Sequence, residues 1–194
     1  MTRGEYGPQT ALVVVDVQND FAHPDGSLYV EGGDAIVEGV NEEIAAVREA
    51  GGLVVYTQDW HPESTPHFDK DGGTWPVHCV RDTWGAELHP DLEVQGPVVK
   101  KGTEGGDGYS GFSVRDPRSG DETSTQLDAI LREHDIERAY VAGLAQDVCV
   151  RATVLDARQH GYETVLLSEL TRPVDPEEGE QALQQVSAAG ATLA

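Results

Sequence analysis

Short apolar runs rich in valine alternate with helix-like patterns along most of the chain, and this alternation limits the folds that it can adopt. Residues 11–15 (ALVVV) form one such run and residues 53–57 (LVVYT) form another. Between them, residues 36–47 carry an apolar side chain at every third or fourth position, which predicts a helix. The further predicted strands are residues 97–100, 139–143, 164–167 and 191–193.

Strand and helix signals keep this alternation to the end of the chain. Helices are predicted over residues 147–160 and 176–188, and another helix starts between Asp121 and Ser124. Repeated strand–helix units predict an α/β fold with helices on both faces of a parallel sheet. We therefore expect residues 1–194 to form a single domain with a doubly wound parallel sheet of about six strands. Ligands bind such sheets beyond the carboxyl ends of the strands.

The charge of the chain restricts its partners. It has 35 acidic and 13 basic residues and a net charge of -22, which opposes binding to nucleic acid or an anionic membrane. There is no signal-peptide pattern and no apolar run of membrane-spanning length. The two cysteines, Cys79 and Cys149, form no disulfide framework. We therefore expect a cytoplasmic protein without nucleic-acid or membrane partners, and we leave a homo-oligomer open.

The segment after the second predicted strand has the composition of a metal site. Residues 59–97 contain all three tryptophans, and loops of this length in compact domains are usually functional. Asp59, His61, His67 and His78 lie within it, and an Asp-X-His pair just past a strand directs two side chains toward one point. Neutral imidazole and carboxylate suit zinc, iron(II), manganese or nickel. The alternative is a polar loop with unrelated histidines, and the clustering favours a metal.

Further reactive side chains fall at other predicted strand ends. Asp16 ends the first strand, Lys101 follows the third, and Cys149 follows the fourth at the start of a helix. Taken singly, these residues are a turn-capping Asp, a solvated Lys and a packed Cys. Together they predict a cysteine hydrolase, in which the helix N-terminus and Lys101 favour the thiolate and Asp16 acts as the base. Main-chain N–H groups of residues 143–149 could form an oxyanion hole.

These motifs together resemble a known family. The chain is similar to nicotinamidases, also called pyrazinamidases, which belong to the isochorismatase-like cysteine hydrolases, and the match runs from about Leu12 to the last helix. The Asp-X-His cluster separates this family from relatives that act on isochorismate or carbamoyl compounds. The matching segments are residues 16–21 (DVQNDF), 59–62 (DWHP), 74–79 (TWPVHC), 101–102 (KG) with 109–112 (YSGF), and 143–153 (GLAQDVCVRAT).

The resemblance implies a catalytic triad of Asp16, Lys101 and Cys149 and an oxyanion hole from the N–H groups of Ala145 and Cys149. It also implies one divalent transition metal, with zinc preferred and iron or manganese as alternatives, which holds the pyridine nitrogen of the substrate. The implied metal ligands are Asp59, His61 and His78, with His67 as a fourth in some members.

The substrate implied by the resemblance is nicotinamide, which is hydrolysed to nicotinate and ammonia through a Cys thioester in NAD salvage. Pyrazinamide is implied as a second substrate. Phe21, Trp75 and Tyr109 match positions that wall the substrate ring, and the peptide between Leu144 and Ala145 matches a cis bond beside the substrate. Two alternatives remain: a relative that cleaves another amide or a ureido group, and a non-enzymatic metal-binding protein with the same fold.

Overall fold

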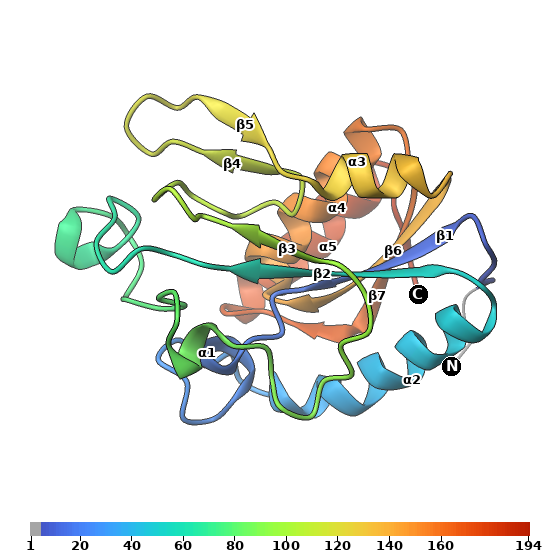
Figure 1. The fold of residues 1–194 in the computed structure, drawn as a ribbon, viewed down its shortest axis with the longest axis horizontal. Coiled ribbons are helices and arrows are strands. Elements are labelled where there is room, and N and C mark those ends of the chain that lie inside the picture. The colour runs from blue at the N-terminus through green and yellow to red at the C-terminus, as the bar shows by residue number, and fades with distance from the viewer. Residues whose placement is uncertain (1–4) are drawn as a thin grey trace.

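A six-stranded parallel sheet forms the centre of the computed structural model, which describes residues 5–194 (Figure 1). The predicted fold class is therefore confirmed. The strand order is β3-β2-β1-β6-β7-β8, so the chain reverses its direction of winding between β1 and β6. A ligand site is expected beyond the carboxyl ends of these two strands. The strands are β1 (Thr10–Val15), β2 (Leu53–Asp59), β3 (Val98–Lys101), β6 (Arg138–Leu144), β7 (Glu163–Arg172) and β8 (Thr192–Leu193).

The alternating side chains of β1 divide the core into two layers. Leu12 and Val14 pack in one apolar cluster with α2, whereas Ala11, Val13 and Val15 pack in another with α3, α4 and α5. Helices therefore cover both faces of the sheet, as Figure 1 shows. The helices are α1 (Asn19–Ala22), α2 (Val37–Glu49), α3 (Leu127–Glu133), α4 (Arg151–Gln159) and α5 (Pro176–Ala188).

A short antiparallel hairpin, absent from the sequence predictions, lies between β3 and α3. It consists of β4 (Ser113–Arg115) and β5 (Glu122–Ser124). The predicted helix start between Asp121 and Ser124 is therefore wrong, because residues 122–124 pair with β4. Thr125 Oγ1 accepts a hydrogen bond from the N–H of Leu127 at 3.1 Å, and α3 begins there.

The loops at the carboxyl ends of the strands carry the remaining short helices. In Figure 1 these loops gather on the side toward which the β2 and β3 arrows point. The predicted third strand, residues 97–100, is shifted by one residue, so Lys101 ends β3. No helix among residues 5–194 is long and apolar enough to cross a membrane. The short helices are η1 (Asp34–Ile36), η2 (Asp69–Asp71), η3 (Trp84–Ala86) and η4 (Gln146–Val150).

Candidate active site

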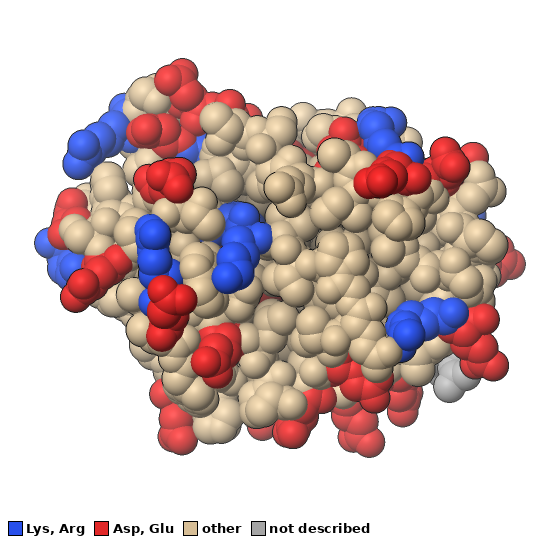
Figure 2. Space-filling view, in the orientation of Figure 1, with Lys and Arg blue, Asp and Glu red and all other residues tan. Residues whose placement is uncertain are grey.

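Most acidic side chains are solvated, and in Figure 2 they lie mainly around the margin of the face shown. The buried carboxylates among residues 5–194 are Asp16, Asp20, Asp59 and Asp147. Asp20 and Asp147 accept hydrogen bonds from backbone N–H groups, which gives them a structural role. Asp16 and Asp59 instead accept bonds from the ammonium of Lys101, at 2.7 Å and 2.6 Å. The sheet thus buries two carboxylates around one cation.

Asp16 directly follows β1, at the place where the strand order reverses. Its φ of 48° turns the chain sharply out of the strand. One carboxylate oxygen accepts from Lys101, and the other accepts from Thr57 Oγ1 at 2.7 Å. Burial raises the pKa of Asp16 to about 6, although Lys101 and Thr57 both lower it and Asp59 adds to the rise. An acid with this pKa can take up and release a proton near neutral pH.

Cys149 lies across the same reversal point, in the η4 turn that leads into α4. Its Sγ lies 3.8 Å from Lys101 Nζ and within 4.8 Å of a carboxylate oxygen of Asp16 and of Asp59. Burial raises the pKa of the Cys149 thiol well above its usual range, and the nearby carboxylates add to this although Lys101 opposes it. Lys101 thus favours the thiolate, as the sequence predicts, but burial outweighs it. The resting sulfur is a thiol that needs a base.

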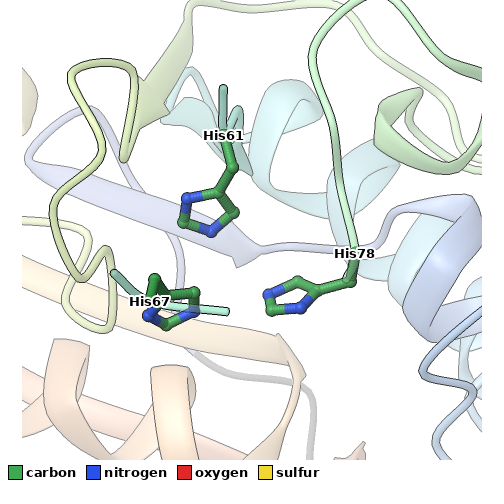
Figure 3. Close-up of side chains that lie close together, drawn as sticks. All are labelled: His61, His67 and His78. Atoms are coloured by element: carbon green, nitrogen blue, oxygen red, sulfur yellow. The ribbon is translucent and has the colours of Figure 1, made fainter. Parts of the chain in front are cut away.

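The predicted metal ligands come together in space. His61, His67 and His78 each offer a ring nitrogen within 4.8 Å of the others, and Figure 3 shows the three rings around one common space. Asp59 Oδ2 lies 3.7 Å from His61 Nε2 and 4.0 Å from His78 Nε2. The carbonyl of Pro76 accepts from His78 Nδ1 at 2.7 Å, which leaves the lone pair on Nε2.

This cluster fits a divalent metal. Both ring nitrogens of His61 are buried without a hydrogen-bond partner, and unpaired buried polar atoms are rare in protein interiors. Burial lowers the pKa of His67, and it lowers that of His78 to about 4, so both rings are neutral at pH 7. Burial acts to raise the pKa of Asp59, but Lys101 and the nearby imidazoles hold it below its usual range. Neutral imidazoles and an ionised carboxylate are the donor set that zinc and similar metals prefer.

A small cavity connects the imidazole cluster to Cys149. Of the residues that the sequence assigns to the substrate, Phe21, Trp75, Tyr109 and Ala145 line it, and Trp75 Nε1 donates to the Tyr109 hydroxyl at 3.0 Å. Leu144 does not line it, because its side chain is buried in the core cluster shared with α2. The peptide between Leu144 and Ala145 is cis, in agreement with the resemblance.

Gln18, to which the sequence motifs assign no role, holds Asp59 in place by hydrogen bonds. Its side-chain oxygen accepts from the N–H of Asp59 at 2.8 Å, and its amide nitrogen donates to the carbonyls of Asp59 and Ala86 at 2.8 Å and 2.9 Å. Thr57, the partner of Asp16, was also missed. The available signal was weak in both cases: Gln18 is a polar residue just after an apolar strand, and Thr57 is a polar residue within one.

Comparison with known proteins identifies the family. A model of the isochorismatase domain matches residues 10–194. The chain belongs to the isochorismatase family. Among its relatives in this family, the nicotinamidase of Escherichia coli (strain K12) is 38% identical over 206 residues, which cover 96% of this chain and 94% of that protein.

Two solved structures of the isochorismatase fold extend this likeness. The pyrazinamidase of Pyrococcus horikoshii in complex with zinc is 42% identical with a TM-score of 0.86, over 96% of this chain and 99% of that one. PnC1 from L. infantum in complex with nicotinate is 37% identical with a TM-score of 0.88, over 97% of this chain and 94% of that one. Within the isochorismatase family the chain therefore groups with the nicotinamidases and pyrazinamidases, as its motifs predict.

Proposed function

We propose that this protein hydrolyses nicotinamide to nicotinate and ammonia, and that it acts on pyrazinamide in the same way. One observation carries the proposal: Asp59, His67 and His78 line the same cavity as Cys149. A ligand with a ring nitrogen at one end and a carboxamide at the other can therefore meet a metal and a nucleophile together. The nicotinamidase and pyrazinamidase relatives support this choice of substrate.

The proposed chemistry starts from the protonated thiol. The Cys149 sulfur attacks the carboxamide carbon, and its proton passes to Asp16, whose pKa of about 6 suits a base near neutral pH. The C–N bond then breaks, and the proton on Asp16 leaves with ammonia. Water attacks the resulting thioester, Asp16 takes a proton from it, and the departing sulfur recovers that proton. Lys101 stays charged throughout, because Asp16 and Asp59 raise its pKa well above its usual range against the effect of burial.

The proposed substrate-binding groups are the cavity walls and the metal site. Asp59, His61, His67 and His78 would hold a divalent metal, for which we prefer zinc, with iron or manganese as alternatives. When bound, that metal supplies a Lewis acid for the ring nitrogen. The N–H groups of Ala145 and Cys149 would accept the charge that develops on the amide oxygen. Phe21, Trp75 and Tyr109 would pack against the ring.

We also infer that residues 1–194 form one hydrolase domain, because both halves of the sheet contribute to the site. Asp16 follows β1 on one side of the reversal, and Ala145 follows β6 on the other. A cytoplasmic role in NAD salvage is proposed from the reaction itself, whose product is a pyridine precursor. Reducing conditions suit the proposed nucleophile, because both cysteines are free thiols.

Ammonia release from a panel of amides, measured before and after chelation, tests the proposed function. Release from nicotinamide that falls on chelation and returns with metal supports it. Release only from carbamoyl or ureido compounds would assign the chain to another branch of the family. No release from any member of the panel by a metal-loaded, folded protein would favour a non-enzymatic metal-binding role.

A further inference from the structure

His67 has a partner that the metal-site motifs do not include. Its Nδ1 lies 2.6 Å from Asp107 Oδ1, across 40 residues of sequence. His67 comes from the long segment after β2, and Asp107 comes from the glycine-rich loop between β3 and β4. The side chains are 4% and 14% exposed, so water competes little for this bond. Two loops are thus joined at one edge of the imidazole cluster.

An ionised carboxylate can only accept a hydrogen bond, so this contact places the ring proton on Nδ1 of His67. The Nε2 lone pair is then free for a metal ion, and the charge of Asp107 makes that nitrogen a better donor. The carbonyl of Pro76 fixes the tautomer of His78 in the same way, but without a charge. The ring of His67 also stacks on His61, with 4.6 Å between centroids and 21° between planes.

The loop that carries Asp107 is also held by backbone hydrogen bonds. The N–H of Asp107 donates to the carbonyl of Arg115 at 2.7 Å, and the N–H of Arg115 donates back to the carbonyl of Asp107 at 3.0 Å. These bonds do not involve the side chain of Asp107. The side-chain carboxylate of Asp107 makes its hydrogen bond to His67 instead.

We propose that Asp107 is a positioning residue that orients His67 and fixes its tautomer for divalent-metal binding. His67 is then a metal ligand whenever the site of this protein holds a metal. The inference rests on the metal site of the proposed function. Asp107 lies outside the expected set of metal ligands, and through it the glycine-rich loop helps the site to retain its metal.

Zinc affinity of the metal-free full-length chain tests this inference. We expect Asp107→Ala to weaken Zn²⁺ binding about 10- to 100-fold. Asp107→Asn keeps an acceptor for Nδ1–H but loses the charge, so its affinity should lie between those of wild type and Asp107→Ala. Glu104→Gln, an exposed site on the same loop, is the matched control and should bind Zn²⁺ as wild type does.

Combining Asp107→Ala with His67→Ala separates positioning from loop structure. If Asp107 acts through His67, the double variant should bind Zn²⁺ no more weakly than His67→Ala does. Independent losses in the double variant, or wild-type affinity in both Asp107 variants, would overturn the inference. If His67→Ala leaves no measurable Zn²⁺ binding, the ranking of Zn²⁺ affinities decides instead. The inference then requires affinity to decrease from wild type to Asp107→Asn to Asp107→Ala. Ammonia release by the wild-type enzyme is measured separately, so a failure of the proposed function can be distinguished from a failure of the inference about Asp107.

Discussion

Asp16 and Asp59 share one ammonium group, because Lys101 Nζ lies 2.7 Å from Asp16 Oδ2 and 2.6 Å from Asp59 Oδ1. All three side chains are buried. Asp16 lies beside the cysteine, whereas Asp59 faces the imidazoles. The candidate base and the candidate metal ligand are therefore electrostatically coupled through Lys101, which offsets part of their combined negative charge.

Lys101→Met should therefore destabilise the protein strongly. Removing the ammonium leaves two buried carboxylates without their shared counter-charge, and breaking a buried pair in this way costs about 3–5 kcal/mol. The neighbouring Lys100 provides the control, because it is exposed and lies over the Trp60 ring at 3.4 Å. Lys100→Met should cost about 1 kcal/mol or less. Urea unfolding of both variants at pH 7 measures the difference, and equal losses would contradict this account of Lys101.

Cys149→Ala should abolish turnover while the fold is kept. We expect ammonia release to fall by roughly 10⁴-fold or more, and Asp16→Asn to be nearly as damaging. Combining the two should cost little more, because nucleophile and base act as a unit. Cys79→Ala is the matched control, since Cys79 is the other cysteine of the chain and is also buried. Substantial activity in the Cys149 variant would exclude the covalent mechanism.

The regular elements of this fold were predictable because each strand carries its own local signal. The apolar run at residues 11–15 is typical of a strand buried on both faces, as in a parallel sheet that is covered by helices. The β4–β5 hairpin carries no clear sequence signal because both strands are three residues long, rich in polar residues and not fully buried at any position. Polar residues such as Asp121 and Ser124 resemble the residues that start a helix. In the structure Thr125 instead accepts the hydrogen bond from the first N–H group of α3.

The site was predictable only as far as residue type and strand-end position determine it. Asp16, Lys101 and Cys149 were placed together because parallel strands bring their carboxyl ends to one edge. The partners of these groups come from three-dimensional contacts that carry no local signal, as with Gln18 and Asp107. The size of the burial effect on Cys149 carries no local signal either, because burial decides the pKa of this thiol and is a property of the folded chain.

The pH dependence of kcat/KM should report Asp16. Its carboxylate has to be ionised to accept the thiol proton, so kcat/KM should rise as the pH increases through about 6. Thr57→Val removes a hydrogen bond that favours the ionised form, so the pKa of Asp16 should increase and the rise should move to higher pH. Thr164→Val, at a buried threonine on β7, should leave the profile unchanged. A shift to lower pH in the Thr57 variant would contradict the role of Asp16 as base.

Elemental analysis should find about one divalent transition metal per chain. His61→Ala and His78→Ala should retain less than about a tenth of it, because each removes a nitrogen that the structure directs into the cluster. His67→Ala should lose less, since water can take the place of that ligand. His134→Ala, at an exposed histidine on the C-terminal side of α3, should keep the full complement. A stoichiometric metal that survives in the His61 and His78 variants would contradict the ligand assignment.

Discrimination between aromatic amides should show what the metal does for binding. Nicotinamide and pyrazinamide carry a ring nitrogen meta to the amide-bearing carbon, picolinamide carries only an ortho nitrogen, and benzamide carries none. A site built around a metal–nitrogen bond rejects an analogue without that nitrogen far more strongly than an apolar pocket does. We therefore expect kcat/KM for benzamide to be at least about a hundredfold below that for nicotinamide, or roughly 3 kcal/mol of transition-state binding.

The same pair of substrates in His61→Ala supplies the control for this last prediction. His61 lies at the imidazole cluster and does not line the cavity, so its loss should remove the metal without reshaping the pocket walls. The advantage of nicotinamide over benzamide should then shrink to the few-fold difference that an apolar pocket gives. Steady-state ammonia release with wild type and variant measures both ratios. Comparable wild-type rates on the two amides would mean that the imidazole cluster is structural, and they would favour a broader amide hydrolase.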